Sequence, residues 1–480
     1  LEVDLEREST ISKLKALVEK KWRIPTSCQS ILLDTAVLKD SALLVAHCSN
    51  DKSALSLTVV VSTTAALRDL QSGIAHYQMK ALADLGALGL KSGVAVGALR
   101  GCLEDNDMDV RRAAVNALVQ VANKGDHHAV TAVSARLEDV HVNVRRAAVE
   151  ALAHVADNGD QHAISMVSVR LEDEAWYVRE AAARTLVRLS EKGDQDAISM
   201  VTARLRDEAW YVREAAVRSL AQVAEKGNRE AIVAVSACLK DANVNVRWAA
   251  VTVLIHVAEK GDRLALSGVS SRLEDEAWCV REAAVEGLAQ IVDRGDQRAI
   301  DAVNARLEHA AVNVRWAAVR ALVNVSEKGD QQVICAVSTR LEDKDGNVRE
   351  AAVEALVDIA HKGDLDAITA VSTRLSHKDE KVRCSALRAL ARIVEKGDQH
   401  ALSLVMICMA DEAWHVREAA ARALIEVAEN GNQDIIAAAS ARLEHEDNED
   451  VRHAVLVALE LLREGVYRGR LQQNACCITL

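Results

Sequence analysis

The residue types that most often carry out chemistry in proteins are present in this sequence, but they do not form a catalytic or metal-binding pattern. The ten cysteines fall at irregular positions, and no two of them are separated by two residues, as paired zinc ligands usually are. The sequence has no phosphate-binding glycine loop and no motif that would activate a nucleophile. We therefore predict a protein that is not an enzyme and that uses no cofactor and no metal ion.

One charged pair does recur at a strict spacing. An arginine follows a valine every 34 residues from Val110 and Arg111 onward, and ten such copies end at Arg417. An eleventh copy, Val451 and Arg452, comes 35 residues later. An aspartate stands six residues before most of these arginines. Such a register marks an internal repeat, which governs the architecture of most of the chain.

Each repeat is predicted to contain two helices, as residues 126–159 illustrate. Asp126 can cap the start of the first helix. The apolar residues of this helix lie on one face: Val130, Val133 and Leu137. A short turn at residues 138–143 leads into a second helix with its own apolar side: Val144, Ala147, Ala148, Ala151 and Leu152. Gly159 is expected to end this second helix in a left-handed conformation.

A lone helix pair cannot bury both of its apolar faces, so successive pairs must stack on one another. Half of the residues are hydrophobic but only 2% are aromatic, and there is a single Pro, a composition that suits unbroken, closely packed helices. We predict a mostly α fold, a right-handed α-solenoid of about eleven 34-residue helix pairs. The predicted domains are a small α+β domain at residues 1–61, a degenerate capping helix pair at 62–92, the repeat solenoid at 93–465 and a C-terminal tail at 466–480.

The repeat motif is Leu-x-Asp, five residues, then Val-Arg-x-Ala-Ala-x-x-Ala-Leu. It resembles the HEAT repeat, especially the short form called phycobilin-lyase-like. In that family the Asp of the turn and the Arg of the second helix form a hydrogen-bonded ladder between neighbouring repeats. The resemblance implies a ladder here at Asp139, Arg145, Asp173, Arg179, Asp207, Arg213, Asp241, Arg247, Asp275 and Arg281. His309, His377 and His445 occupy the Asp position in three repeats, so the ladder lacks its aspartate there.

Residues 1–61 lack the repeat and resemble the ubiquitin-like β-grasp fold from its second strand onward. The resemblance rests on an alternating segment at residues 1–5, a helical segment, Ile24 and Pro25 after it, the strand that contains Leu32, and a closing strand at residues 55–61. In ubiquitin an apolar patch on the sheet recruits partners, and the matching positions here are Leu32 and Thr58. The resemblance implies either a partner site at Leu32 or a domain that covers the apolar end of the first repeat.

Two tryptophans are candidates for partner binding. Trp248 and Trp316 each follow a Val-Arg pair directly, at a position where several other repeats carry Glu. A position that accepts both Glu and Trp is normally solvated. We therefore predict a protein-binding surface on the second-helix face that includes Trp248, Trp316, Arg320 and Arg388. The tryptophans of the recurring Asp-Glu-Ala-Trp turn are interpreted instead as residues that pack between turns: Trp176, Trp210, Trp278 and Trp414.

Charge and hydropathy narrow the choice of partners. The net charge of −12 argues against nucleic acid, whose phosphates are bound by clustered Lys and Arg. No apolar run approaches the roughly 18 residues that a membrane-spanning helix needs. The last four residues begin with Cys477 and fit a prenylation pattern, so lipid anchoring there is one prediction. The scattered cysteines indicate reduced thiols and a cytoplasmic protein.

The enzymatic alternatives come from the same resemblance. The deoxyhypusine hydroxylases, a HEAT-like class, hold iron with several His-Glu pairs, whereas this sequence has one, His445 and Glu446. The phycobilin lyases have similar repeats, but no distinctive site residue can be matched. We predict a non-catalytic scaffold or adaptor that binds one or more proteins. The alternatives are a ubiquitin-pathway adaptor that acts through Leu32 and a bilin-lyase-like enzyme.

Overall fold

The computed structural model describes residues 9–33, 36–47, 56–89 and 93–476, and this part of the chain holds 25 α-helices and three β-strands. The chain divides into two compact units, Leu1–Glu225 and Lys226–Leu480, and each is described by itself. The sequence predicts a single solenoid over residues 93–465, whereas this division falls within the repeats. In a stacked array each pair contacts only its neighbours, so no single core fixes where one unit ends.

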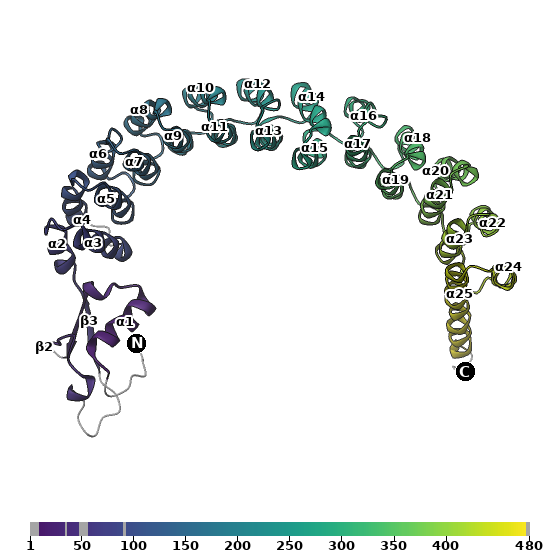
Figure 1. The fold of residues 1–480 in the computed structure, drawn as a ribbon, viewed down its shortest axis with the longest axis horizontal. Helices are drawn as coiled ribbons and strands as arrows, with labels where there is room; N and C mark the ends of the chain where they lie inside the picture. Colours follow the sequence, from purple (N-terminus) through teal and green to yellow (C-terminus); the bar gives the residue numbers. More distant parts are fainter. Residues whose placement is uncertain (1–8, 34–35, 48–55, 90–92, 477–480) are drawn as a thin grey trace. The chain divides into compact units, whose positions relative to one another are not determined.

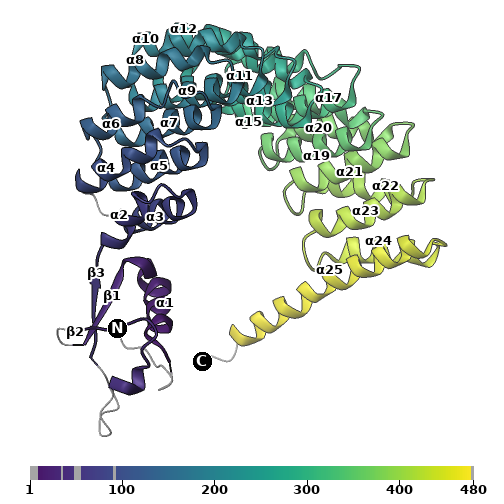
Figure 2. The ribbon, with the colours of Figure 1, turned by 60° about the vertical axis from the view of Figure 1, so that its left-hand side comes forward.

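The first unit begins with a small sheet and one helix (Figure 2). The central strand pairs antiparallel with a strand on each side, in the order β2-β1-β3. Ile11, Val18 and Ile31 form the core between the helix and the sheet. The alternating segment predicted at residues 1–5 lies outside the described residues. The elements are α1 (Ile11–Trp22), β1 (Gln29–Leu33), β2 (Ala36–Val37) and β3 (Thr58–Val61).

A short helix pair follows the sheet within residues 62–92. Its helices are α2 (Thr64–Leu70) and α3 (Ala75–Leu88). The Ser27 hydroxyl, in a turn that precedes β1, donates a hydrogen bond to the Asp84 carboxylate of α3. The backbone N–H of Ser62 donates to the carbonyl of Cys28 at 2.8 Å. The sheet domain is thus joined to the first helix pair through side-chain and backbone hydrogen bonds.

Eleven further helix pairs follow in the described chain. In the first unit they are α4 (Gly93–Leu99) and α5 (Met108–Val121), α6 (His127–Ser134) and α7 (Val142–Val155), α8 (Gln161–Val169) and α9 (Trp176–Leu189), and α10 (Gln195–Ala203) and α11 (Trp210–Val223). In the second unit they are α12 (Arg229–Cys238) and α13 (Val244–Val257), α14 (Arg263–Ser271) and α15 (Trp278–Ile291), α16 (Gln297–Asn304) and α17 (Val312–Val325), α18 (Gln331–Thr339) and α19 (Gly346–Ile359), α20 (Leu365–Ser372) and α21 (Glu380–Ile393), α22 (Gln399–Cys408) and α23 (Trp414–Val427), and α24 (Gln433–Glu444) and α25 (Glu449–Cys476).

Within each unit the first helices of the pairs form one layer and the second helices form the other (Figure 1). The apolar stripes of both layers meet between them. In the repeat of α6 and α7, Ala129, Val133 and Leu137 from the first half and Val144 and Leu152 from the second are all fully buried. Small alanines between these aliphatic residues let the helices approach closely. The side of each second helix that faces away from the first-helix layer, here called the outward side, is left free of this packing.

The corner between repeats differs from the sequence prediction in one respect. The second helix α7 ends at Val155, and its C-cap residue Ala156 is already extended, so Gly159 does not end the helix. Gly159 lies three residues further on with φ of 81°, a conformation that favours glycine. Its N–H donates to the carbonyl of Leu189, at the end of the second helix of the next repeat, at 2.6 Å. The glycine therefore satisfies a carbonyl that the neighbouring helix leaves open.

The predicted cap of the first helix is present. The Asp126 carboxylate accepts hydrogen bonds from the N–H groups of His128 and Ala129. Asp160 caps the first helix of the next repeat in the same way. At the other end of the array, α25 continues to Cys476, past the predicted start of a tail at residue 466 (Figure 2). The lipidation candidate Cys477 lies outside the described residues.

Candidate functional site

An arginine of each second helix lies beside the turn of the next repeat. Arg145 donates from Nε and Nη2 to both carboxylate oxygens of Asp173, at 2.8 and 2.9 Å. Its Nη1 donates to the carbonyl of Asp139 in its own repeat at 3.0 Å. Both charged side chains are more than nine-tenths buried. The same two-pronged pair joins Arg111 to Asp139, Arg179 to Asp207, Arg247 to Asp275, Arg315 to Asp343 and Arg383 to Asp411.

The electrostatics of these pairs follow from burial and hydrogen bonding together. Burial raises the pKa of Asp173. Hydrogen bonds from Arg145 and from the N–H of Ala175 lower this pKa, as do the positive charges of Arg145 and Arg170. Together they outweigh burial, so the pKa of Asp173 lies below its ordinary value. The hydrogen bond to Asp173 raises the pKa of Arg145. Both groups therefore stay charged at neutral pH. Two other predicted ladder residues, Arg213 and Asp241, lie on either side of the boundary between the units.

The arginine pairing changes where histidine replaces the aspartate. Arg281 faces the position of His309, and Arg349 faces that of His377. Within the described part of the chain, neither arginine forms an ion pair, and the buried Nε of Arg349 has no hydrogen-bond partner. Each histidine instead accepts the backbone N–H two residues later at Nδ1, at 3.1 Å. In the last repeat, Glu446 takes over from His445 and pairs with Arg417 at 2.7 Å.

A second row of arginines was not predicted from the sequence. Arg136, in the turn after the first helix, donates to the carbonyl of Leu103 in the preceding repeat at 2.8 Å. The same contact, 33 residues back in the chain, is made by Arg170, Arg204, Arg272 and Arg340. The signal was present in the recurring Arg-Leu pair after the first helix, although nothing in that pair states which carbonyl the arginine would reach.

The predicted partner-binding residues lie on the outward side of the second helices in the second unit. Trp248 and Trp316 are half-buried. Arg320, one turn after Trp316, lies over its indole ring with the guanidinium carbon 4.7 Å from the ring centre. Arg320 also forms an ion pair with Glu282 of α15 at 2.7 Å, and Arg388 forms one with Glu350 at 2.5 Å. Both arginines are therefore engaged within the chain.

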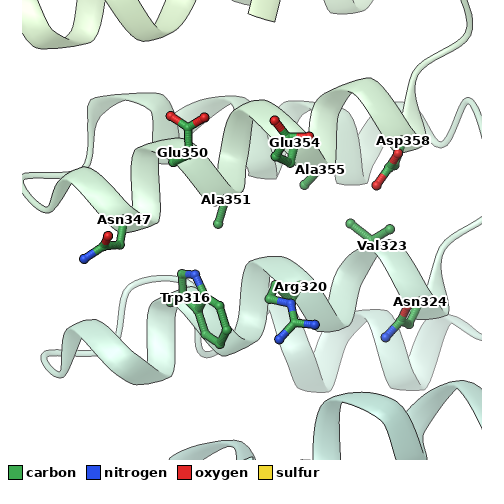
Figure 3. A pocket seen from close by; sticks show the side chains of 10 residues that line it. All are labelled: Trp316, Arg320, Val323, Asn324, Asn347, Glu350, Ala351, Glu354, Ala355 and Asp358. Atoms are coloured by element: carbon green, nitrogen blue, oxygen red, sulfur yellow. The ribbon is translucent and has the colours of Figure 1, made fainter. Parts of the chain in front are cut away.

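A hollow of about 450 Å³ lies between α17 and α19 (Figure 3). Trp316, Arg320, Val323 and Asn324 line it from α17. Ala351, Ala355 and the carboxylates of Glu350, Glu354 and Asp358 are among the residues that line it from α19. The hollow thus combines an aromatic ring and small apolar side chains with three acids and one base.

Three more hollows lie on second helices. One of about 290 Å³ between α13 and α15 is lined by Trp248, Trp278, Glu282 and Glu286, among others. One of about 490 Å³ on α19, α21 and α23 includes Cys384 and carries three arginines and three glutamates. In the first unit, a smaller one of about 200 Å³ between α7 and α9 has three arginines and two glutamates. The two hollows that contain a tryptophan are the two with an excess of acids.

The turn tryptophans fall into two groups. Trp176 stacks on Tyr211 of the next repeat with ring centres 4.5 Å apart, and Trp210 stacks on Tyr211 at 3.6 Å. Trp278 departs from the packing interpretation, because it is 62% exposed and lines the α13/α15 hollow. Sequence reasoning did not select Trp278, since its turn motif is the same as that of the packed tryptophans.

Leu32 lies in the N-terminal sheet. It pairs directly with Thr58 of β3 and with Val37 of β2. Leu32 is half-buried, whereas Val37 is 65% exposed. Leu32 and Val37 thus contribute apolar surface, partly open to solvent, on the N-terminal sheet, far along the sequence from the tryptophan hollows.

Two negative observations apply to the residues that the structure describes. No three His, Cys, Asp or Glu side chains among them are grouped as a metal site would require. None of their helices is both long enough and apolar enough to span a membrane.

Helix pairs that stack on their neighbours place the chain in the class of α-solenoid proteins. A profile described as HEAT repeats matches residues 75–153, 130–221, 201–289, 232–322, 266–357, 302–374 and 368–460. The chain therefore belongs to the HEAT-repeat family. No protein with a curated description is significantly similar to it in sequence.

Several solved structures share this fold. Kap121p bound to Ste12p is 13% identical, with a TM-score of 0.59 over 86% of this chain and 50% of Kap121p. Kap121p bound to RanGTP gives 14% identity and a TM-score of 0.59 over the same shares. Importin beta is 15% identical, with a TM-score of 0.50 over 83% of this chain and 64% of importin beta. The chain thus spans about half of the length of Kap121p, and at this identity the likeness concerns the fold.

Proposed function

We propose that this protein is a non-catalytic scaffold that binds other proteins along the second-helix face of its second unit. The observation that carries the proposal is the α17/α19 hollow, which combines Trp316 with the exposed carboxylate of Asp358 on rigid helices. Buried aromatic anchors at the centre of a contact supply much of the binding energy of protein interfaces. Structures of Kap121p bound to Ste12p and to Nup53p lend support, because they show that a solenoid of this fold can bind other proteins.

The mechanism is geometric. Each second helix is fixed by its buried stripe, by the arginine ladder at one edge and by the glycine corner at the other. The side chains on its outward side are therefore held at set positions before any partner arrives, which lowers the entropy lost on binding. Many modest contacts along the row of helices would add to a specific interaction without a cofactor.

Affinity purification from the source cell, followed by titration of the captured partner, tests the proposal. Replacement of both Trp248 and Trp316 by Ala should weaken binding by about 2 kcal/mol or more, which is about thirtyfold in Kd. Trp210→Ala provides the matched control, because that ring stacks within the chain. Unchanged affinity of the double variant, with the helix content intact, would contradict the proposal.

A second candidate function is that of a ubiquitin-pathway adaptor. We infer it from the N-terminal domain, whose helix packs on a sheet that presents Leu32 and Val37 together. The order β2-β1-β3 supports a ubiquitin-like domain. Leu32→Asp should abolish binding to a ubiquitin-receptor domain in this case, while the tryptophan double variant should leave it unchanged. The reverse pattern would favour the solenoid surface.

A phycobilin-lyase-like activity would show as an absorbance change when the protein is incubated with free bilin. A cytoplasmic location would show as diffuse signal from a tagged chain in the source cell, outside membranes and organelles.

A further inference from the structure

A joint is the contact between the second helices of two neighbouring repeats, and the joints from α13 to α23 alternate in structure. The α23/α25 joint, where Arg417 pairs with Glu446, lies outside this alternation. At the α13/α15, α17/α19 and α21/α23 joints the buried arginine ladder is complete, through Arg247, Arg315 and Arg383. At the α15/α17 and α19/α21 joints a histidine stands in the ladder, and Arg281 and Arg349 have no carboxylate partner among the described residues. The pattern therefore repeats every 68 residues, or every two repeats.

On the outward side of the second helices, ion pairs are present at the joints that lack the ladder. At the joints without the ladder, ion pairs link the two second helices across the surface: Arg320 with Glu282, Arg388 with Glu350, and Arg392 with Glu354. At the α13/α15 and α17/α19 joints, Trp248 and Trp316 occupy the position from which Glu282 and Glu350 form these pairs. A hollow is present at each of these two joints.

The two tryptophan hollows are similar in chemistry. The α13/α15 hollow has two acids and no Lys or Arg in its lining, and the α17/α19 hollow has three acids and one Arg. Glu282, Glu350 and Glu354 form ion pairs with arginines, so each hollow keeps one carboxylate that forms no ion pair. Glu286 in the first and Asp358 in the second are exposed and form no hydrogen bond or ion pair with another described residue. The ladder holds each joint together at its edge, so the hollow can stay open without loss of the joint.

Building on the scaffold function proposed above, we propose that these two hollows are equivalent sites for two basic side chains of one extended segment of a partner protein. The aliphatic stem of a Lys or Arg would pack on Trp248 or Trp316, and its charged end would reach Glu286 or Asp358. Charge complementarity selects a basic occupant, since an acidic segment would be repelled at both sites.

The spacing of the anchors follows from the geometry of the array. Neighbouring packed helices are about 8–10 Å apart, so hollows two helices apart are separated by roughly 16–20 Å. An extended chain advances about 3.3 Å per residue. The two basic anchors should therefore stand about five or six residues apart in the partner, with little dependence on the residues between them.

Labelled synthetic peptides test this inference by fluorescence anisotropy with the full chain. The first peptide carries two basic residues, one Lys and one Arg, six residues apart in a background of Ser and Thr. The second peptide has the same two residues three residues apart. The third peptide has Glu in place of both basic residues. The six-residue peptide should bind about tenfold more tightly than the three-residue peptide, because both hollows are then filled at once. The Glu peptide should not bind, and salt should weaken the binding of the other two.

Variants assign the effect to the hollows. Trp248→Ala or Trp316→Ala should remove the advantage of the six-residue peptide, and Trp210→Ala should preserve it. Glu286→Gln with Asp358→Asn changes only exposed groups, so it tests the electrostatic part without a risk to folding. Asp366→Asn, in the first-helix layer, is its matched control.

Several results would overturn the inference. They are binding that ignores anchor spacing, equal binding of the Glu peptide, or a dimer of this chain that Trp316→Ala dissociates. If no peptide binds but the captured partner still depends on Trp248 and Trp316, the basic-segment inference fails and the scaffold function stands. If neither peptide nor captured partner depends on these residues, both fail.

Discussion

The arginine ladder allows a prediction with an internal control, because the chain contains both a complete joint and an incomplete one. Asp343→Ala would leave Arg315 without its carboxylate, and the two side chains are only 6% and 3% exposed. Removing one partner of a buried ion pair typically costs about 3–5 kcal/mol, since the remaining charge stays desolvated. At the position 34 residues earlier, His309→Ala removes only a hydrogen bond from a backbone N–H, worth about 1 kcal/mol.

The difference between the two substitutions, about 2–4 kcal/mol by these figures, isolates the ion pair. Both substitutions remove the acceptor of one backbone N–H, so that contribution cancels. A long array need not unfold in a single step, and a global melting curve would average over many repeats. Hydrogen exchange of the α17 and α19 amides, measured by mass spectrometry, reports on the affected joint directly.

The expected result is a large loss of protection in α17 and α19 for Asp343→Ala. His309→Ala should produce a small loss in α15 and α17. Equal losses for the two variants would refute the reasoning, because they would mean that the carboxylate contributes no more than the backbone hydrogen bond.

Three further predictions concern single groups. Burial raises the pKa of Asp173, but hydrogen bonds and charge from Arg145 lower it overall below the ordinary 3.8. The contribution of the Asp173–Arg145 pair to stability should therefore be present above about pH 4 and be lost as the pH falls through the folded-state pKa. Loss of helix by circular dichroism already near pH 6, absent from an Asp173→Asn variant, would contradict this. Gly159→Ala should destabilise the chain by about 1–2 kcal/mol because of its left-handed conformation, whereas Gly97→Ala, in a helix with open space around it, should be neutral or slightly stabilising in the same thermal melts. Burial raises the pKa of Cys384 to about 11, so iodoacetamide at pH 8 should alkylate it much more slowly in the folded chain than in urea, and equal rates would show that the thiol is not shielded.

Much of the fold could be predicted from the sequence because the spacing of apolar residues within a repeat determines which helix faces are buried. Apolar residues at helical spacing in Val144 to Leu152 fix which side of the helix is buried, and the 34-residue period fixes how often the pattern recurs. The first-helix caps, such as Asp160, are local and depend on a few neighbouring residues. The glycine at position 159 was predicted to be left-handed, but its hydrogen bond to Leu189 could not be read from one repeat alone.

The sequence by itself determined that this chain is an array of helix pairs, with Trp248 and Trp316 at equivalent positions of two second helices. Only the tertiary structure decided which charges meet, because Arg320 and Glu282 are 38 residues apart and become neighbours only when two helices pack. The same packing revealed Trp278 as a lining residue, although its motif is identical to that of packed tryptophans. Periodicity determines which face of a helix is buried, whereas the distance between two exposed side chains depends on how the helices that carry them are stacked.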